Sequence, residues 1–286
     1  MTAMFSEEPR TQQPLSAPAY DQWMTPDGEP KAGFYRTPQG ILVRFYDEAD
    51  FEISNEGAVM CWPASGADSR IAESLFANAI TPMLANHNGG LNLHGSAVAN
   101  EEGGIAFLGH SRSGKTTLAG ACARAGMAFV TEDVTELTQD KGQAEQGYWL
   151  QPKTPELRLF SDSAEHLLGT GSGIGSDDRK QPALLTPEMA VQDRPVPLGA
   201  IFLLGDGVSG TVKIAPLTSQ NALSKMLQHS FVLDVEDRPR LKAHFARLAD
   251  LARAVPCFTL DYPREYSALP DVIAAVRAAV LKGSAQ

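Results

Sequence analysis

The sequence predicts an α/β fold, in which helices flank a central β-sheet. Residues 105–108 form a short, wholly apolar run, as expected for a buried central strand. A glycine-rich loop and a helix over about 116–124 follow this run, and residues 127–130 are a second buried strand. Strand, loop, helix and strand in this order are the building unit of an α/β domain.

Length and composition are those of an ordinary globular protein. The chain has 286 residues, of which 43% are hydrophobic and 20% charged, which suits one large domain or two small ones. Its net charge of −10 argues against general nucleic-acid binding, because phosphates must be neutralised by cations. A local basic pocket for a nucleotide is compatible with that charge.

Cysteine usage and hydropathy favour a reducing cytoplasm. Cys61, Cys122 and Cys257 are far apart and show no CxxC spacing, which argues against a disulfide framework or a structural zinc site. No run approaches 18 uninterrupted apolar residues, so no transmembrane helix and no membrane partner are expected. The first residues lack the basic and apolar regions of a signal peptide.

The first 90 residues are predicted to form two parts. Residues 1–32 are polar and hold five prolines, which predicts a loose N-terminal arm that Tyr20 and Trp23 could dock locally. Strands are predicted over 41–46 and 51–53, around an acidic turn, and an amphipathic helix over 70–80, with Pro82 just beyond it. We expect 33–90 to be an accessory α/β region.

Residues 91–286 are predicted to form the core domain. The segment 169–182 is rich in Gly, Ser and Asp, which predicts a mobile loop. The remaining elements are expected as strands over 93–99, 200–204 and 257–260 and as helices near 219–230, 238–254 and 270–281.

Residues 109–116, GHSRSGKT, match the phosphate-loop pattern GxxxxGK[ST] in full. The glycines let the backbone curl so that successive N–H groups face a phosphate, and the following helix adds its N-terminal dipole. Lys115 is predicted to reach the β- and γ-phosphates, and the Thr116 hydroxyl to bind Mg²⁺. The alternative is a glycine-rich turn with a surface lysine. The predicted nucleotide-binding residues are Gly109, His110, Ser111, Arg112, Ser113, Gly114, Lys115, Thr116 and Thr117.

Two carboxylates follow the next buried strand. Glu132 and Asp133 come directly after Thr131, and Asp133 lies 18 residues after Lys115. Carboxylates at the end of a strand beside a phosphate loop can hold Mg²⁺, or one of them can accept a proton from an attacking hydroxyl. The alternative is a pair of solvated turn carboxylates.

Four motifs stand in a fixed order between residues 93 and 158. They are Leu93-His94-Gly95, the loop GHSRSGKT, Thr131-Glu132-Asp133 and Pro155-Glu156-Leu157-Arg158. Their order and spacing resemble HPr kinase/phosphorylase, which phosphorylates a serine of a small carrier protein. The resemblance is closer to the shorter HPr-kinase-related proteins, including kinases of lasso-peptide precursors, and covers residues 91–160; 197–204 and 262–264 are also similar. It implies a P-loop core with a central mixed β-sheet flanked by helices, as in the HPr kinase C-terminal domain.

The resemblance also implies roles for individual residues. Asp133 matches the general base on the acceptor hydroxyl, His94 the histidine that lines the reaction centre, and Arg158 an arginine that steadies phosphate charge. Glu156 matches a glutamate near Mg²⁺, so the implied metal residues are Thr116, Glu132 and Glu156. ATP and Mg²⁺ are the implied cofactors. The implied partners are a small protein or peptide acceptor and further copies of the chain in a homo-oligomer.

The motifs depart from the family pattern at three positions. Glu132 stands where the family has an aspartate, His110 replaces an acidic residue and Arg112 replaces a glycine. HPr as the substrate, and the reverse reaction, are therefore not part of the expectation. Arg112 either contacts phosphate or points to solvent, and Arg264 either contacts phosphate or caps a core element.

Other positions also keep more than one interpretation. Without the resemblance, His94 is better explained as a structural strand histidine, and that alternative stays open. Residues 177–180 either close over the nucleotide, bind the acceptor, or form a solvated loop.

The leading hypothesis is an ATP- and Mg²⁺-dependent kinase acting on a serine or threonine of a small protein or peptide. A kinase of small molecules is the first alternative, because many such enzymes also pair a phosphate loop with a carboxylate one strand later. A non-catalytic nucleotide-binding module is the second.

Overall fold

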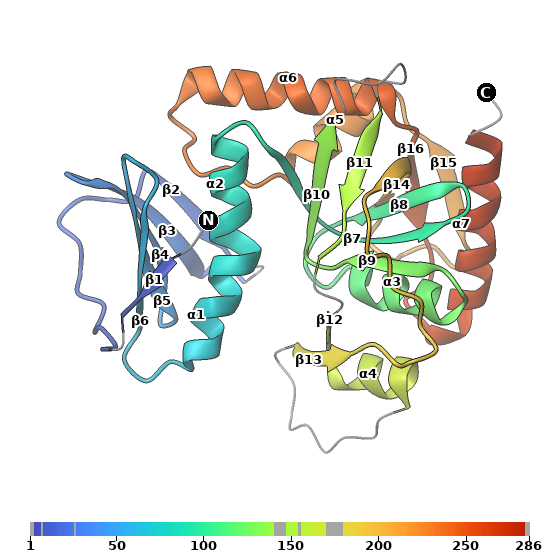
Figure 1. Ribbon diagram of the computed structural model, residues 1–286, viewed down its shortest axis with the longest axis horizontal. Helices are drawn as coiled ribbons and strands as arrows, with labels where there is room; N and C mark the ends of the chain where they lie inside the picture. The colour runs from blue at the N-terminus through green and yellow to red at the C-terminus, as the bar shows by residue number, and fades with distance from the viewer. Residues whose placement is uncertain are drawn as a thin grey trace. The chain divides into compact units, whose positions relative to one another are not determined.

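The computed structural model describes residues 3–6, 8–25, 27–139, 147–153, 156–169 and 180–283. The chain folds into two compact units (Figure 1). The first unit comprises Met1–Ala85 and Val232–Asp237, and the second comprises Asn86–Phe231 and Arg238–Gln286. The chain therefore leaves the first unit after Ala85 and returns to it for six residues, a return that the sequence analysis did not foresee.

A six-stranded sheet forms the body of the first unit. All neighbouring strands are antiparallel except the first pair, β1 and β6. The spatial order is β1 (Ala3–Phe5), β6 (Val59–Pro63), β5 (Ala49–Ser54), β4 (Gly40–Phe45), β3 (Pro30–Thr37) and β2 (Asp21–Met24).

Two of these strands lie in the segment that the sequence analysis described as a loose arm. The Trp23 ring in β2 packs edge-on against Phe34 and Phe45, with ring centroids 5.5 and 6.1 Å apart. Tyr20 packs on Phe34 as well, at 6.2 Å. Aromatic burial of this kind supplies the stabilisation that a proline-rich segment otherwise lacks. The arm is therefore strand-bearing at 3–5 and 21–24.

A continuous helical run follows the first sheet. It consists of α1 (Ser69–Leu75), the π-helical turn η1 (Phe76–Ile80) and α2 (Thr81–His87). The predicted helix over 70–80 therefore continues past Pro82. Proline has no N–H to donate to the preceding turn, and a widened π turn immediately before it accommodates that loss.

An ion pair and a hydrogen bond hold the returning segment, Val232–Asp237, on the first sheet. The Arg36 guanidinium on β3 donates to both carboxylate oxygens of Asp234 at 2.8 and 2.7 Å. Tyr20 donates its hydroxyl proton to the backbone oxygen of Leu233 at 2.9 Å. A two-pronged arginine–carboxylate pair gives orientation as well as attraction.

The second unit contains a mixed sheet, as the sequence analysis expected. β14 lies parallel to both β8 and β16, whereas β7 lies antiparallel to β8 and β10. β11 pairs with both β10 and β14, so β10, β7, β8, β14 and β11 close a ring of paired strands. The order is β11 (Tyr148–Gln151), β10 (Val134–Gln139), β7 (Leu91–Asn100), β8 (Gly103–Leu108), β14 (Val196–Leu204), β16 (Cys257–Asp261) and β15 (Lys213–Pro216), with β9 (Ala128–Thr131) on β7.

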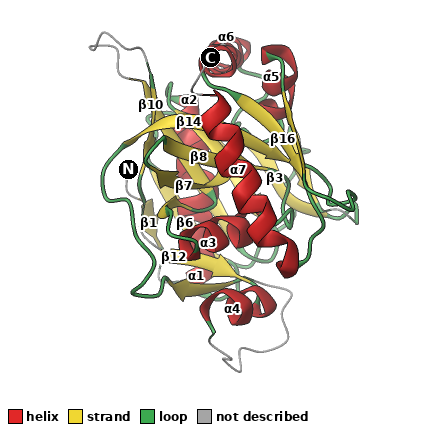
Figure 2. Cartoon of the chain, turned by 90° about the vertical axis from the view of Figure 1, so that its right-hand side faces the viewer, coloured by secondary structure: helices red, strands yellow, loops and turns green. Residues whose placement is uncertain are grey.

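Helices cover both faces of this sheet (Figure 2). α3 (Lys115–Arg124) and α7 (Leu269–Gly283) pack in one core cluster, and α5 (Ser219–Leu227) and α6 (Arg238–Ala254) in the other. Ile105 and Phe107 of β8 belong to the first cluster, whereas Ala106 and Leu108 belong to the second. Alternate residues of a strand face opposite sides, so burial on both sides requires the unbroken apolar run seen in the sequence.

A small two-stranded sheet and two short helices complete the second unit. The antiparallel strands are β12 (Glu156–Leu159) and β13 (Gln181–Leu184), and α4 (Ser161–Leu168) follows β12. A 3₁₀ turn, η2 (Tyr266–Ala268), precedes α7. None of these elements was predicted. Most of the predicted loop over 169–182 lies outside the described residues, but Gln181 and Pro182 are part of β13.

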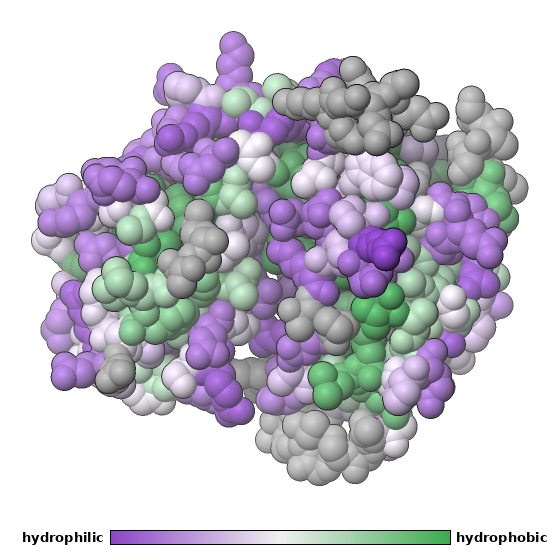
Figure 3. All heavy atoms as spheres, in the orientation of Figure 1, coloured by the Kyte–Doolittle hydropathy of each residue, from purple (hydrophilic) through white to green (hydrophobic). Residues whose placement is uncertain are grey.

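The surface is mixed in character. Hydrophilic and hydrophobic side chains are interspersed on the face of each unit that Figure 3 shows. The three cysteines are buried free thiols. Along the described ranges, none of the helices combines the length and the apolar composition of a membrane span.

Candidate phosphate-transfer site

The loop between β8 and α3 ends in a backbone conformation that glycine adopts without strain. Gly114 adopts φ 87°, a left-handed conformation, directly before the first residue of α3. A Cβ atom there would lie 3.3 Å from the Tyr262 hydroxyl. At Gly109, a Cβ atom would lie 2.5 Å from Oγ of Ser113. At both glycines of the sequence motif, a neighbouring side chain therefore lies close to the backbone, where a Cβ atom would crowd it.

Lys115 is folded back onto this loop. Its Nζ donates to the backbone oxygens of Gly109 and His110, each at 2.8 Å. Burial and then the positive charge of Lys180 lower the pKa of Lys115 to about 8, against the opposite effect of the nearby carboxylates. Ser113 lies beside it, and its buried Oγ has no hydrogen-bond partner among the described residues.

Glu132 is tied to the first turn of α3. The Thr116 hydroxyl donates to Oε1 of Glu132 at 2.8 Å, and the Arg158 backbone N–H donates to Oε2 in a short hydrogen bond. Burial raises the pKa of Glu132 to about 7, and the negative charge of Asp133 contributes to the rise. Two residues that the sequence analysis assigned to Mg²⁺ therefore lie in direct contact.

Asp133 occupies a tight turn between β9 and β10. Its φ is 58°, a left-handed value that aspartate tolerates better than most residues. Thr131 closes the turn, because its hydroxyl donates to the backbone oxygen of Val134 at 2.9 Å. The Asp133 backbone oxygen accepts from Nδ1 of His94 at 2.9 Å and from the Gly95 N–H at 3.2 Å. These contacts fix the direction of the carboxylate.

Positive groups surround the Asp133 carboxylate. Lys180 Nζ lies 3.4 Å from Oδ1, and a guanidinium nitrogen of Arg158 lies 3.8 Å from Oδ2. Burial alone would raise the pKa of Asp133, but Lys180, His94, Arg158 and Lys115 together lower it below its ordinary value. Asp133 is therefore ionised at neutral pH. His94 has its pKa lowered to about 4 by burial and by Lys115, so it is neutral there.

Lys180 completes the cluster, and the sequence analysis gave it no role apart from that of the segment 177–180. Its Nζ lies 3.0 Å from Oγ1 of Thr116 and 3.2 Å from Oε1 of Glu132. It directly precedes β13, whose pairing with β12 places the two strands together. The only sequence signal was its membership of the charged segment 177–180, of which 177–179 lie outside the described residues.

Glu156 is the predicted metal residue that the cluster does not include. It begins β12, two residues before Arg158 and therefore on the same face of the strand. In the described chain, no hydrogen bond or ion pair joins it to Thr116, Glu132 or Asp133. Pro155, from the same motif, lies outside the described residues.

The remaining loop residues line the approaches to the cluster. Arg112 also has a left-handed backbone, with φ 64°, and its guanidinium lies 5.5 Å from the centre of the Phe160 ring. The His110 ring stands edge-on to His229, with centroids 5.0 Å apart. Ser111 is exposed. Thr117 shares a hydrogen bond of 3.2 Å with the Ser163 hydroxyl.

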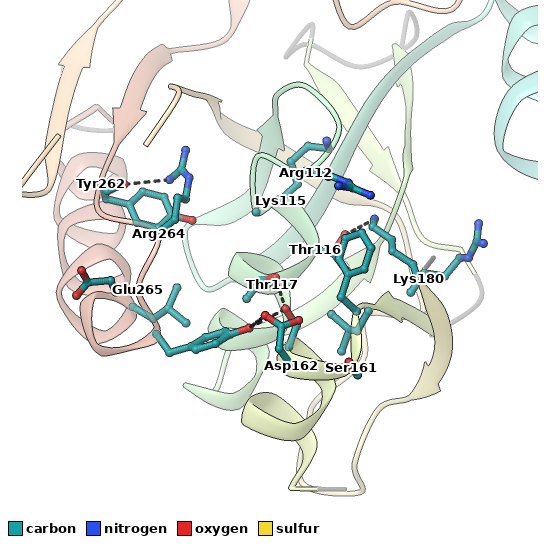
Figure 4. A pocket seen from close by; sticks show the side chains of 17 residues that line it. Arg112, Lys115, Thr116, Thr117, Ser161, Asp162, Lys180, Tyr262, Arg264 and Glu265 are labelled. Atoms are coloured by element: carbon teal, nitrogen blue, oxygen red, sulfur yellow. Dashed lines mark hydrogen bonds between the residues drawn. The ribbon is translucent and has the colours of Figure 1, made fainter. Parts of the chain in front are cut away.

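A cavity of about 580 Å³ opens beside the loop (Figure 4). Lys180 and Thr116 lie at one part of its wall, and Tyr262, Arg264 and Glu265 at another. The Arg264 guanidinium stacks on the Tyr262 ring at 4.0 Å and donates to the Gly205 backbone oxygen at 2.6 Å. The other lining residues are Arg112, Gly114, Lys115, Thr117, Arg158, Leu159, Phe160, Ser161, Asp162, Ser163, Tyr266 and Leu269.

Comparisons with known proteins add little to this geometry. No protein-family model matches the chain, and no curated protein matches it. Among solved structures, the chain is similar to the HPr(Ser) kinase/phosphatase from Coxiella burnetii. The TM-score is 0.37 at 12% identity, over 67% of this chain and 97% of that one. A likeness this weak carries no argument about fold or activity.

Proposed function

We propose that this protein is a kinase that transfers the γ-phosphoryl group of Mg²⁺-ATP to a serine or threonine hydroxyl of a small protein or peptide. One observation carries the proposal. Asp133, an ionised carboxylate, lies in one cluster with the phosphate-loop residue Thr116 and with the basic groups of Arg158 and Lys180. A base, a metal ligand and cations at one place are the parts that phosphoryl transfer needs.

The loop residues fit a nucleotide phosphate. The buried Ser113 hydroxyl has a hydrogen-bond donor to offer, and the Lys115 ammonium donates to carbonyl oxygens of the loop itself, which phosphate oxygens can replace. The left-handed conformation of Gly114 turns the chain at the start of α3, where free backbone N–H groups can bind an anion. Phosphate oxygens are stronger acceptors than carbonyls for a buried ammonium.

The donor set beside the loop fits Mg²⁺. Thr116 offers a hydroxyl and Glu132 a carboxylate, and hard oxygen ligands of this kind are those that Mg²⁺ prefers. When bound, the metal neutralises phosphate charge and helps to orient the γ-phosphoryl group. Because Glu132 is already fixed by Thr116 and by the Arg158 N–H, its oxygens need little reorganisation to bind a cation.

The chain's own groups account for the transfer step. Asp133 accepts the proton of the acceptor hydroxyl, whose oxygen forms a bond to the γ-phosphorus while the bond to the β,γ-bridging oxygen breaks. ADP leaves with that electron pair. The Arg158 guanidinium neutralises charge on the transferring group, and His94 holds the turn that aims Asp133.

The cavity beside the loop supports binding of the nucleoside. Its volume of about 580 Å³ lies within the ordinary range of small-ligand sites. Tyr262, Tyr266 and Phe160 supply aromatic surface, and Asp162 and Ser163 supply polar edges. A purine next to the phosphate loop needs both kinds of surface.

The acceptor class is supported by the resemblance of the four motifs to HPr kinase/phosphorylase. Phosphate transfer from Mg²⁺-ATP into a size-fractionated lysate of the source organism tests it, with mass spectrometry to locate the modified atom. We expect phosphoserine or phosphothreonine on one small protein or peptide. Phosphate found only in a metabolite fraction would replace this acceptor with a small molecule. ATP binding without any transfer would leave a binding module.

A further inference from the structure

The Lys180 ammonium stands at the centre of three side-chain oxygens. Nζ lies 3.0 Å from Oγ1 of Thr116, 3.2 Å from Oε1 of Glu132 and 3.4 Å from Oδ1 of Asp133. Figure 4 shows the Lys180 side chain reaching towards Thr116 at the wall of the cavity. These oxygens come from α3 and from the turn after β9, so the lysine bridges the first turn of a helix and the end of a strand.

The hydroxyl of Thr116 is oriented for a cation. Its proton points to Oε1 of Glu132, because a carboxylate of this kind accepts and the hydroxyl donates. The oxygen's lone pairs are therefore free to face Lys180, from which they accept. A metal ligand needs this same orientation, with the proton turned away from the metal and the lone pairs towards it.

The carboxylate pair also requires a counter-charge. The side chains of Glu132 and Asp133 are only 4% and 14% exposed, so water does little to compensate them. Two carboxylates placed together in such surroundings repel each other, and a neighbouring cation removes that repulsion. Lys180 brings one positive charge, whereas Mg²⁺ would bring two.

We propose that Lys180 is a built-in counter-ion that holds the cation position of this carboxylate pair and exchanges with Mg²⁺. The proposal rests on the proposed function only for the identity of the metal. Mg²⁺ binds oxygens at 2.0–2.1 Å. An ammonium in hydrogen-bonding contact with the same Thr116 and Glu132 oxygens would then stand too close to it, so one cation excludes the other. Metal entry therefore expels the ammonium, and metal loss draws it back.

The exchange has a consequence for metal affinity. The nucleotide-free protein should bind a divalent ion weakly, because the ion must displace an ammonium that is already well placed. ATP changes this balance, since its phosphate oxygens add ligands for the metal and acceptors for the released lysine. Lys180 thus acts as a positioning residue that makes the protein take up metal together with nucleotide.

Binding of Mn²⁺ to the nucleotide-free full-length protein tests the exchange, measured by the electron paramagnetic resonance of free Mn²⁺. Lys180→Met removes the charge at nearly constant length, and Lys180→Arg keeps the charge. Lys242→Met, on the exposed surface of α6, removes the same charge elsewhere. We expect Lys180→Met to bind Mn²⁺ roughly 10- to 100-fold more tightly than the wild type. Lys180→Arg should stay within about threefold because it keeps a positive charge at the cluster. Lys242→Met should do so because charge away from the cluster is screened.

Mn²⁺ affinity of Lys180→Met equal to or weaker than that of the wild type would overturn the exchange. A second measurement on the wild type covers the case that Lys180→Met does not fold. The reactivity of Lys180 towards an acetylating reagent, followed by mass spectrometry, should rise when Mg²⁺ and a non-hydrolysable ATP analogue are added together. Unchanged reactivity at saturating analogue would also overturn it. If the wild type failed to bind ATP, the proposed kinase function would be wrong, whereas the Mn²⁺ measurement would still decide the cation exchange.

Discussion

The Thr116 hydroxyl donates a hydrogen bond of 2.8 Å to Oε1 of Glu132, and this contact joins the first turn of α3 to the end of β9. In the proposed kinase, the loop before Thr116 provides the phosphate-facing groups, and the turn that follows β9 provides Asp133. Two motifs that are separate in the sequence therefore form one site through this pair.

Gly114→Ala is expected to weaken nucleotide binding by at least about tenfold. The left-handed conformation costs a residue with a Cβ atom roughly 1–2 kcal/mol, and here that atom would also press on the Tyr262 hydroxyl. Calorimetric titration with Mg²⁺-ATP measures the affinity, and thermal unfolding measures the stability.

Gly126→Ala provides the matched control at the other end of α3. Gly126 has the same φ of 87°, but a Cβ atom there meets nothing within 4 Å. We expect a similar loss of stability and an unchanged affinity for nucleotide. Equal losses of affinity in both variants would mean that the effect at Gly114 comes from global destabilisation.

Glu132→Gln is expected to raise the Mg²⁺ concentration needed for half-maximal ATP binding by roughly 10- to 100-fold. Glu132 contacts Thr116 and the Arg158 N–H, whereas no contact in the described chain joins Glu156 to this pair. Glu156→Gln should therefore change the Mg²⁺ requirement by less than about threefold. A larger effect of Glu156→Gln than of Glu132→Gln would mean that the metal binds nearer to β12, where the motif resemblance implies a glutamate close to Mg²⁺.

The stability of the protein is expected to fall on the acid side of pH 6.5, in part through His244. Its Nδ1 accepts from Arg247 at 3.4 Å, and Nε2 faces the Ser230 hydroxyl in a short hydrogen bond. Burial lowers the pKa of His244 to about 4, and the charge of Arg247 adds to this effect. The unfolded chain therefore binds more protons than the folded one between pH 6.5 and 4, so unfolding becomes easier as pH falls.

His244→Gln should flatten this dependence. From pH 7.5 to pH 5, the free energy of unfolding of the wild type should drop by about 2 kcal/mol more than that of the variant. Urea unfolding at the two pH values provides the measurement. Parallel losses in both proteins would show that His244 is not the group responsible.

The main sheet of the second unit was predictable because its strands carry a strong local signal. The runs 105–108 and 200–204 are wholly apolar, and both faces of β8 and β14 are in fact buried. β13 and β15 have mostly exposed side chains, and α4 is a short helix with a polar sequence. Such elements depend on distant partners for their stability, and local patterns do not reveal them.

The grouping of the candidate-site residues was predictable to the extent that they follow strands or loops with a recognisable pattern. Thr116, Glu132 and Asp133 come from such positions and lie together. Lys180 is 64 residues from Thr116, and only the pairing of β12 with β13 brings it to the cluster. The spacing of residues along the chain contains no information about a contact of that kind.

The activity of Asp133→Asn tests the central claim most directly. Asparagine tolerates the left-handed φ of 58° at this position and keeps the size of the side chain. Asp47→Asn is the matched control, because Asp47 is exposed in a turn of the first unit with φ 60°. The measurement is single-turnover phosphate transfer together with calorimetric ATP binding. We expect Asp133→Asn to keep its ATP affinity and to lose transfer by roughly 10²- to 10⁴-fold, while Asp47→Asn matches the wild type. Transfer at the wild-type rate by Asp133→Asn would contradict the assignment of the base.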